Sequence, residues 1–339
     1  MTYSLIRIEQ AWIQGDVEKR DALLAEEGLT LQAFEVALEA QKVQAWERLN
    51  QCRKTLGSSL IERIRVLTEH FLGTPYGLVI DILTPWHHPD IAQNQCVRVD
   101  CFDCVTFVEM VLALASYTGE EPLPSAAFYA HLYRWMFIPN TAPDSFTRHR
   151  FIDGTWLHDN ATWLTDCTRH LPFAIEEQSH VLGKGGVIAK QLENFSEAGR
   201  DAAYFPTALR EAMLKDAKVY PAMEIVTPYI PLKTCIEEYS ALEHYLRSQP
   251  EAVYVLTVIS DAPHLPRLVG SAYHVTHLGF LLIEPQGLRL RHATSIAPHA
   301  VVDIALIDYA TLRYQQIVTQ GFSEKAGKVK GFGLYRIRM

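Results

Sequence analysis

The sequence has no apolar run of the roughly 18–20 residues that a helix needs to cross a bilayer. Its N-terminus also lacks a basic segment followed by an apolar stretch and a small-residue cleavage site. We therefore expect a cytoplasmic protein, a periplasmic one if a leader has been removed, or one delivered by a leader-independent secretion route. The sequence does not decide among these three.

Positive charge is in short supply as well. The 339 residues include 31 Lys and Arg against 39 Asp and Glu, a formal net charge of −8 at pH 7. Proteins that bind nucleic acid normally present a basic face, so we expect no nucleic-acid partner. Hydrophobic residues make up 48% of the chain and charged residues 21%, which is typical of a globular protein with an ample core.

Six cysteines in a chain of this length do not indicate a disulfide scaffold. Three of them, Cys96, Cys101 and Cys104, fall within nine positions. Cys101 and Cys104 could bind zinc together with His87 and His88, but no second Cys-x-x-Cys pair exists. A redox pair is a further alternative, although no β-α-β pattern surrounds it. We rank both below a nucleophilic role for Cys104, and we predict no metal and no cofactor.

Cys104 stands where a polar loop becomes the apolar run 105–117. This run predicts a buried helix with Cys104 on its first turn. Free backbone N–H groups and the positive end of the helix dipole favour a thiolate there, and the thiolate is the nucleophilic form. The dipole contributes only roughly 0.3–1 kcal/mol, less than one pKa unit, so a base or a second cation is also needed. In the alternative interpretation, Cys104 is simply a small core hydrophobe.

Helices precede strands in the predicted order of elements. Thr30 is placed to cap a helix over 31–49, and Ser59 with Glu62 forms a capping box for a helix that must end at Gly73. Residues 120–165 contain several prolines and are expected to be rich in loops, and their many aromatic residues suit the walls of a cleft. Residues 173–215 have no assignment. The expected strands are 253–259, 275–283, 288–292 and 334–337.

This order is typical of an α+β domain in which the layers are segregated. We predict a helix that carries the nucleophile at its N-terminus and packs on an antiparallel sheet. The expected division is a helical N-terminal extension over 1–57 and a catalytic domain over 58–339.

Two histidines in the strand region supply the base that Cys104 needs. Glu284-Pro285-Gln286-Gly287 predicts a tight turn, and a hairpin centred on it pairs Gly279 with His292 and leaves His277 diagonal to His292. Because Gly279 has no side chain, the two imidazoles have room to approach. We predict that His277 is the base, oriented by His292, and that Cys104 is the nucleophile. His274 and His299 are possible substitutes, and either predicted histidine could be a packed structural residue instead.

A family resemblance rests on several stretches in order. They are Phe71-Leu72-Gly73-Thr74-Pro75-Tyr76, Asp103-Cys104-Val105-Thr106-Phe107-Val108-Glu109, Arg148 with Trp156 and Asn160, Pro228-Tyr229-Ile230-Pro231, His277-Leu278-Gly279-Phe280 and His292-Ala293. Over about residues 60–338 the chain resembles the N-acetylmuramoyl-L-alanine amidase-like branch of the NlpC-type cysteine hydrolases, which have a papain-like fold. The helical extension and much of 170–220 lie outside the resemblance.

The resemblance implies a bacterial cysteine amidase with a triad of Cys104, His277 and His292. Its implied reaction is hydrolysis of the amide between N-acetylmuramic acid, or its anhydro form, and L-alanine in peptidoglycan or soluble muropeptides. The implied substrate-binding residues are Tyr76, Asp103, Thr106, Arg148 and Trp156, with Tyr76 beside the thiol and Arg148 near sugar or peptide carboxylates. Two alternatives stay open: an endopeptidase that cuts the D-glutamyl–diamino-acid bond, and a non-catalytic protein that binds cell-wall fragments.

Overall fold

The computed structural model describes residues 2–13, 16–77, 97–140, 148–149, 151–183, 223–262, 266–267, 270–320 and 328–338. His87 and His88, which entered the zinc alternative, and Cys96 lie outside the described residues, as do 184–215 of the unassigned region. Within the described residues, no helix is both long enough and apolar enough to cross a membrane.

The N-terminal part of the chain is helical, as predicted. Thr30 Oγ1 accepts the Ala33 N–H and starts the third helix, while Ser59 Oγ accepts the Glu62 N–H and starts the fourth. Both caps therefore lie where the sequence placed them. The third helix runs four residues past the predicted end at 49. The four helices are α1 (Thr2–Ile13), α2 (Val17–Glu26), α3 (Leu31–Arg53) and α4 (Leu60–His70).

Two further helices follow before the first strand. α5 (Cys104–Ser116) is the predicted nucleophile helix, and ten of its residues are buried. α6 (Ala126–Met136), capped by Ser125, occupies a region that we expected to consist largely of loops. Its buried residues Phe128, Leu132 and Trp135 recur at helical spacing, a signal masked by the surrounding prolines. The short elements η1 (Ile152–Trp156) and α7 (Leu157–Asp159) come next.

The remaining described elements build one antiparallel sheet and the helices on its second face. The sheet order is β2-β3-β8-β4-β5-β6-β7, and β1 also pairs with β8. The four predicted strands correspond to β4, β5, β6 and β8. The elements are β1 (Leu164–Asp166), η2 (Thr168–His170), β2 (Glu176–Leu182), β3 (Met223–Pro231), α11 (Leu232–Glu237), α12 (Tyr239–Ser248), β4 (Tyr254–Asp261), β5 (Val275–Glu284), β6 (Gly287–Ala293), β7 (Val301–Ala305), α14 (Leu306–Gln320) and β8 (Lys328–Ile337).

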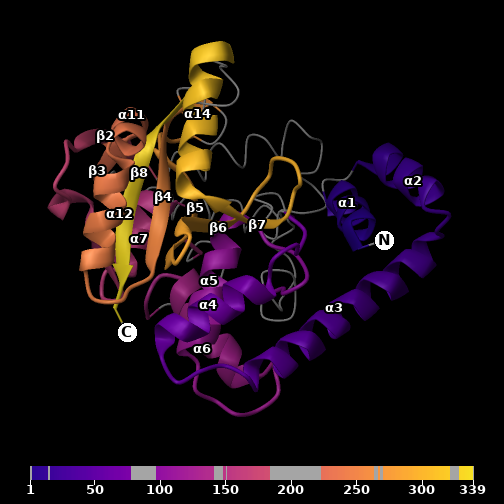
Figure 1. Cartoon of the computed structure of the whole chain (residues 1–339). Helices are drawn as coiled ribbons and strands as arrows, with labels where there is room; N and C mark the ends of the chain where they lie inside the picture. Colours follow the sequence, from indigo (N-terminus) through magenta and orange to yellow (C-terminus); the bar gives the residue numbers. More distant parts are fainter. Residues whose placement is uncertain are drawn as a thin grey trace.

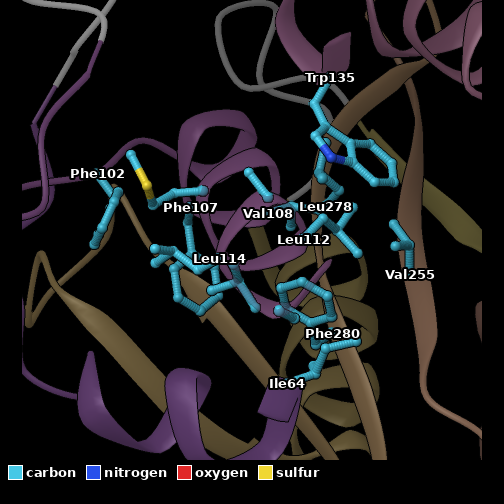
Figure 2. Packing of buried hydrophobic residues seen from close by; sticks show 14 of the residues in the cluster. Ile64, Phe102, Phe107, Val108, Leu112, Leu114, Trp135, Val255, Leu278 and Phe280 are labelled. Atoms are coloured by element: carbon cyan, nitrogen blue, oxygen red, sulfur yellow. The ribbon is translucent and has the colours of Figure 1, made fainter. Parts of the chain in front are cut away.

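Side chains that alternate along the strands divide the core into two layers. On one face Val255, Leu278 and Phe280 pack with α4, α5 and α6, and on the other Leu256, Leu281 and related residues pack with α11, α12 and α14. Figure 2 shows side chains of α5 clustered with Leu278 and Phe280 of β5, and the rings of Phe107 and Phe280 meet edge to face at 5.8 Å. The α+β class with an antiparallel sheet is thus confirmed.

The hairpin that carries both predicted histidines has the predicted register. Glu284 pairs with Gly287 and Phe280 with Arg291, so the ladder runs toward the Gly279–His292 position. A Cβ on Gly279 would lie 2.6 Å from the Cβ of His292 and 2.7 Å from the Arg291 carbonyl oxygen. Glycine is therefore required for the two strands to approach this closely.

Candidate active site

Asp103 and Thr106 fix the start of α5. Asp103 Oδ1 accepts the N–H groups of Val105 (2.9 Å) and Thr106 (2.7 Å), and Thr106 Oγ1 accepts the Asp103 N–H at 3.0 Å. This reciprocal capping box holds Cys104 as the first helical residue. Both side chains are buried, so the structure shows them positioning the nucleophile; their predicted contact with substrate stays a prediction.

Cys104 is partly exposed as a residue, and backbone N–H groups lie within reach of its sulfur. Burial raises its pKa to about 12, and the Asp103 carboxylate adds to the rise. The N–H groups of Leu278, Cys104 and Val105 act in the opposite direction on the same pKa. Desolvation of the thiol thus outweighs the stabilisation that the helix dipole gives a thiolate at this position. The resting group is a neutral thiol that needs a base.

His277 and His292 form a hydrogen-bonded pair beside this thiol. His277 Nε2 lies 2.7 Å from His292 Nδ1, and the rings are nearly perpendicular, with centroids 4.8 Å apart. Burial lowers the pKa of His292 to about 4 and lowers the pKa of His277 well below its usual value. Both imidazoles are therefore neutral at neutral pH, and a neutral imidazole can accept a proton.

The thiol and the histidine pair meet at β5. The Leu278 N–H that reaches the sulfur belongs to the residue after His277. Tyr309 on α14 provides a second link, since its ring is 5.3 Å from that of His292 and the Cys104 charge contributes to raising its pKa. The sulfur of Cys104 at the start of α5 thus lies against β5 next to His277, and His277 is hydrogen-bonded to His292 of β6.

Tyr76 also lies near the thiol. Its backbone forms a bridge with Phe102, and its N–H donates to the His299 carbonyl oxygen at 2.7 Å. Burial and the charges of Cys104 and Asp103 raise the pKa of its phenol, so the hydroxyl keeps its proton at neutral pH.

Arg148 and Trp156 are both in the core. The Arg148 guanidinium is bidentate to Glu109, at 2.7 and 2.6 Å, and also donates to the Met136 carbonyl oxygen. Arg148 is 4% exposed and Trp156 1%. The predicted role of both residues in binding substrate is untested and stays a prediction. The role that the structure does show for Arg148 is to neutralise Glu109, one helical turn beyond Cys104.

The alternative histidines have other partners. The His274 ring lies 3.2 Å from the Ser260 carbonyl oxygen and packs edge to face on His180. His299 contributes its carbonyl oxygen to Tyr76. In the described part of the chain, no group of three His, Cys, Asp or Glu residues could hold a metal ion.

α14 contributes two residues that the sequence analysis did not single out. The Arg313 guanidinium lies over the Tyr309 ring, 4.9 Å from its centroid, and its charge helps to lower the pKa of both His277 and His292. Tyr309 in turn packs against His292. The only signal was the helical pattern of 306–320, which says nothing about which strand the helix covers.

Comparison with known proteins decides the family. The model of the AmiA-like family, N-acetylmuramoyl-L-alanine amidase-like, matches residues 66–315. The chain belongs to this family. The curated proteins include no match.

Several solved structures have a similar fold. The crystal structure of protein LPG0564 from Legionella pneumophila, assigned to the family model DUF1460, is 22% identical; the match covers 88% of this chain and 97% of that one, with a TM-score of 0.65. An N-acetylmuramoyl-L-alanine amidase from Bacteroides uniformis is 15% identical and matches over 84% of this chain and 100% of its own, with a TM-score of 0.50. At these identities the likeness shows the fold alone.

The lowered pKa of His292 predicts an acid-dependent loss of stability. The unfolded chain binds a proton at this side chain below about pH 6.5, whereas the folded chain does so only below about 4. The free energy of unfolding should therefore fall by roughly 3 kcal/mol between these values on account of His292. Urea unfolding of His292→Gln across this range should show a shallower pH slope than the wild type.

The control for this prediction is His244→Gln, at an exposed position on α12. It should keep the wild-type slope. An unchanged slope in His292→Gln would contradict a neutral, buried imidazole at this position.

Proposed function

We propose that this AmiA-like chain is a cysteine hydrolase that cleaves the amide between N-acetylmuramic acid, or its anhydro form, and L-alanine in peptidoglycan fragments. One observation carries the proposal. The neutral imidazoles of His277 and His292 are hydrogen-bonded at 2.7 Å, and the N–H of Leu278, the residue after His277, reaches the Cys104 sulfur. The family supports the substrate class. We further propose that the arrangement is that of the papain-like NlpC-type hydrolases.

The first step activates the thiol. Because His277 Nε2 is engaged with His292, its Nδ1 is the ring nitrogen left for Cys104. His277 then carries its proton on Nε2, and this N–H donates a hydrogen bond to His292 Nδ1. The hydrogen bond fixes the tautomer of His277 and orients its ring. His277 takes the thiol proton as the sulfur attacks the lactyl carbonyl carbon. The resulting imidazolium shares its charge with His292 rather than with a carboxylate.

The oxyanion formed in this attack needs hydrogen-bond donors close to the sulfur. Asp103 Oδ1 accepts the N–H groups of Val105 and Thr106 but not that of Cys104. The Cys104 N–H lies close to the sulfur of the same residue. The Cys104 N–H and the protonated Tyr76 hydroxyl are the donors that we assign to the oxyanion. A donor of this kind lowers the barrier by roughly 3–4 kcal/mol in other acyl-transfer enzymes.

The second half of the reaction releases both products. His277, now protonated, donates to the alanine nitrogen as the C–N bond breaks, and the peptide leaves with a free amine. Water then attacks the thioester carbonyl with His277 as base, which restores the thiol and frees the lactyl carboxylate.

Product masses from a defined muropeptide test the proposal. A muramoyl tripeptide with L-alanine, D-glutamate and a diamino acid should yield the free sugar acid and the intact tripeptide. Release of the diamino acid alone would overturn the assigned bond in favour of endopeptidase cleavage. Tight binding without any new mass would instead identify a non-catalytic binding protein.

A further inference from the structure

The N-terminal helices pack directly on the segment that leads to the nucleophile. The core of α1, α2 and α3 contains Ile6, Ile8, Phe34 and Leu38, and it also contains Cys101, which is 2% exposed and stands three residues before Cys104. Figure 1 shows α3 running from α4 out to α1 and α2. The matched family region begins at residue 66, so it assigns no role to these helices.

Buried charge joins the same two parts. The Arg98 guanidinium is bidentate to Asp100, at 2.9 and 2.7 Å, and its third nitrogen donates to Glu9 of α1. Gln41 of α3 donates to Asp100 at 2.9 Å. All four side chains are less than 9% exposed. Such a network is favourable only while every member keeps its partner, so it specifies one arrangement of loop and helices.

α1 also supports the segment that carries Tyr76. A Cβ on Gly77 would lie 3.1 Å from both the Cys101 sulfur and Ile6 Cγ2, so this segment, the nucleophile loop and α1 are in close contact. Two backbone hydrogen bonds connect 75–77 to Phe102: its N–H donates to the Pro75 carbonyl oxygen and its carbonyl accepts the Gly77 N–H, both at 3.0 Å. α1 therefore packs near both segments that lead into the active site, 75–77 and the loop before Cys104.

We propose that α1 and α3 act as a clamp that positions Cys104 and Tyr76 through Glu9, Gln41, Arg98 and Asp100, which are positioning residues. The inference rests on the proposed function for its catalytic meaning. Its structural content, the coupling of α1 to segments 75–77 and 97–103, is independent of the reaction. The clamp acts through Arg98, because the guanidinium of that side chain donates to both Glu9 and Asp100.

Glu9→Ala tests the clamp because it removes the α1 partner of Arg98 and leaves the Arg98–Asp100 pair. With the muramoyl tripeptide we expect kcat to fall roughly 10- to 100-fold while KM stays within about twofold of the wild type. This is the effect expected when reacting groups are slightly displaced. Glu9→Gln keeps an acceptor oxygen for Arg98 and should retain most of the rate. Glu35→Ala, at an exposed position on α3, is the matched control and should match the wild type.

Hydrogen exchange supplies the readout that does not need turnover. In Glu9→Ala the amides of Phe102 and Gly77 should lose protection while those of β4 and α14 keep it. Wild-type kcat together with wild-type protection at Phe102 and Gly77 would overturn the clamp, and so would an equal loss of protection in β4. If the wild type hydrolyses no muropeptide, the proposed function fails, while the exchange result still decides the coupling.

If Glu9→Ala does not fold, Gln41→Leu provides a second test of the clamp. It removes one hydrogen bond from a neutral amide to the Asp100 carboxylate and changes no formal charge. The same selective loss of protection at Phe102 and Gly77 is expected, in smaller measure. Unchanged exchange there would overturn the proposal.

Discussion

Replacing Cys104 with alanine is expected to lower turnover of a muramoyl tripeptide by at least about a thousandfold, because the variant has no atom that can form the thioester. The fold should survive the change. The capping box that starts α5 uses Asp103 and Thr106 and not the thiol, and alanine is a good helix former. Initial rates by chromatography of the products, with a thermal melt of each protein, measure both quantities.

A matched control separates loss of the nucleophile from loss of a cysteine. Cys52 is partly exposed near the end of α3, and Cys52→Ala should keep the wild-type rate. A Cys104→Ala protein that turns over at the normal rate would contradict the nucleophile assignment. So would a Cys104→Ala protein that is inactive only because its melting temperature has collapsed.

The second large effect concerns the ion pair inside the core. Arg148→Met should destabilise the fold by roughly 3–5 kcal/mol, because Glu109 is fully buried and would lose the guanidinium with which it pairs. Burial already raises the pKa of Glu109 to about 7, and Arg148 opposes that rise. Without Arg148 the pKa of Glu109 should rise further. The variant should therefore be less destabilised at pH 5, where Glu109 is protonated, than at pH 8.

The double variant Glu109→Leu with Arg148→Met measures the penalty for the unpaired charge. It should recover most of the lost stability, since a buried pair replaced by apolar residues is often neutral. Arg134→Met, at an exposed position on α6, serves as the surface control. Urea unfolding of all four proteins at both pH values provides the comparison. Equal destabilisation in the single and double variants would contradict an energetic role for charge pairing.

The part of the site that could be predicted is the part that local rules determine. The tight turn before Gly287 and the alternation of β5 and β6 were sufficient to place His277 diagonal to His292, and the observed register agrees. The absence of a side chain at Gly279 was visible in the sequence, and it is what lets the strands approach. The place of Cys104 in the first turn of α5 likewise followed from the change from polar loop to apolar run.

The rest depends on contacts between distant parts of the chain. The sequence placed Cys104 at a helix start, but burial dominates the pKa of its thiol, and the extent of that burial cannot be inferred from helix rules. Glu109 and Arg148 are 39 positions apart, so their pairing could not be read from spacing. Tyr309 and Arg313 reach the histidines only because α14 crosses that face of the sheet. Likewise, the contact of Glu9 with Arg98 joins regions that the sequence analysis assigned to separate domains.

Trapping the acyl-enzyme is the most direct test of the central claim. Wild-type protein is mixed with the muramoyl tripeptide, quenched in acid within one turnover, digested and mapped by mass spectrometry. The peptide that contains Cys104 should carry the mass of the muramoyl group as a thioester, and His277→Ala should show far less of it at the same time point. Continued release of tripeptide with no adduct on Cys104, or with the adduct on another residue, would contradict the account.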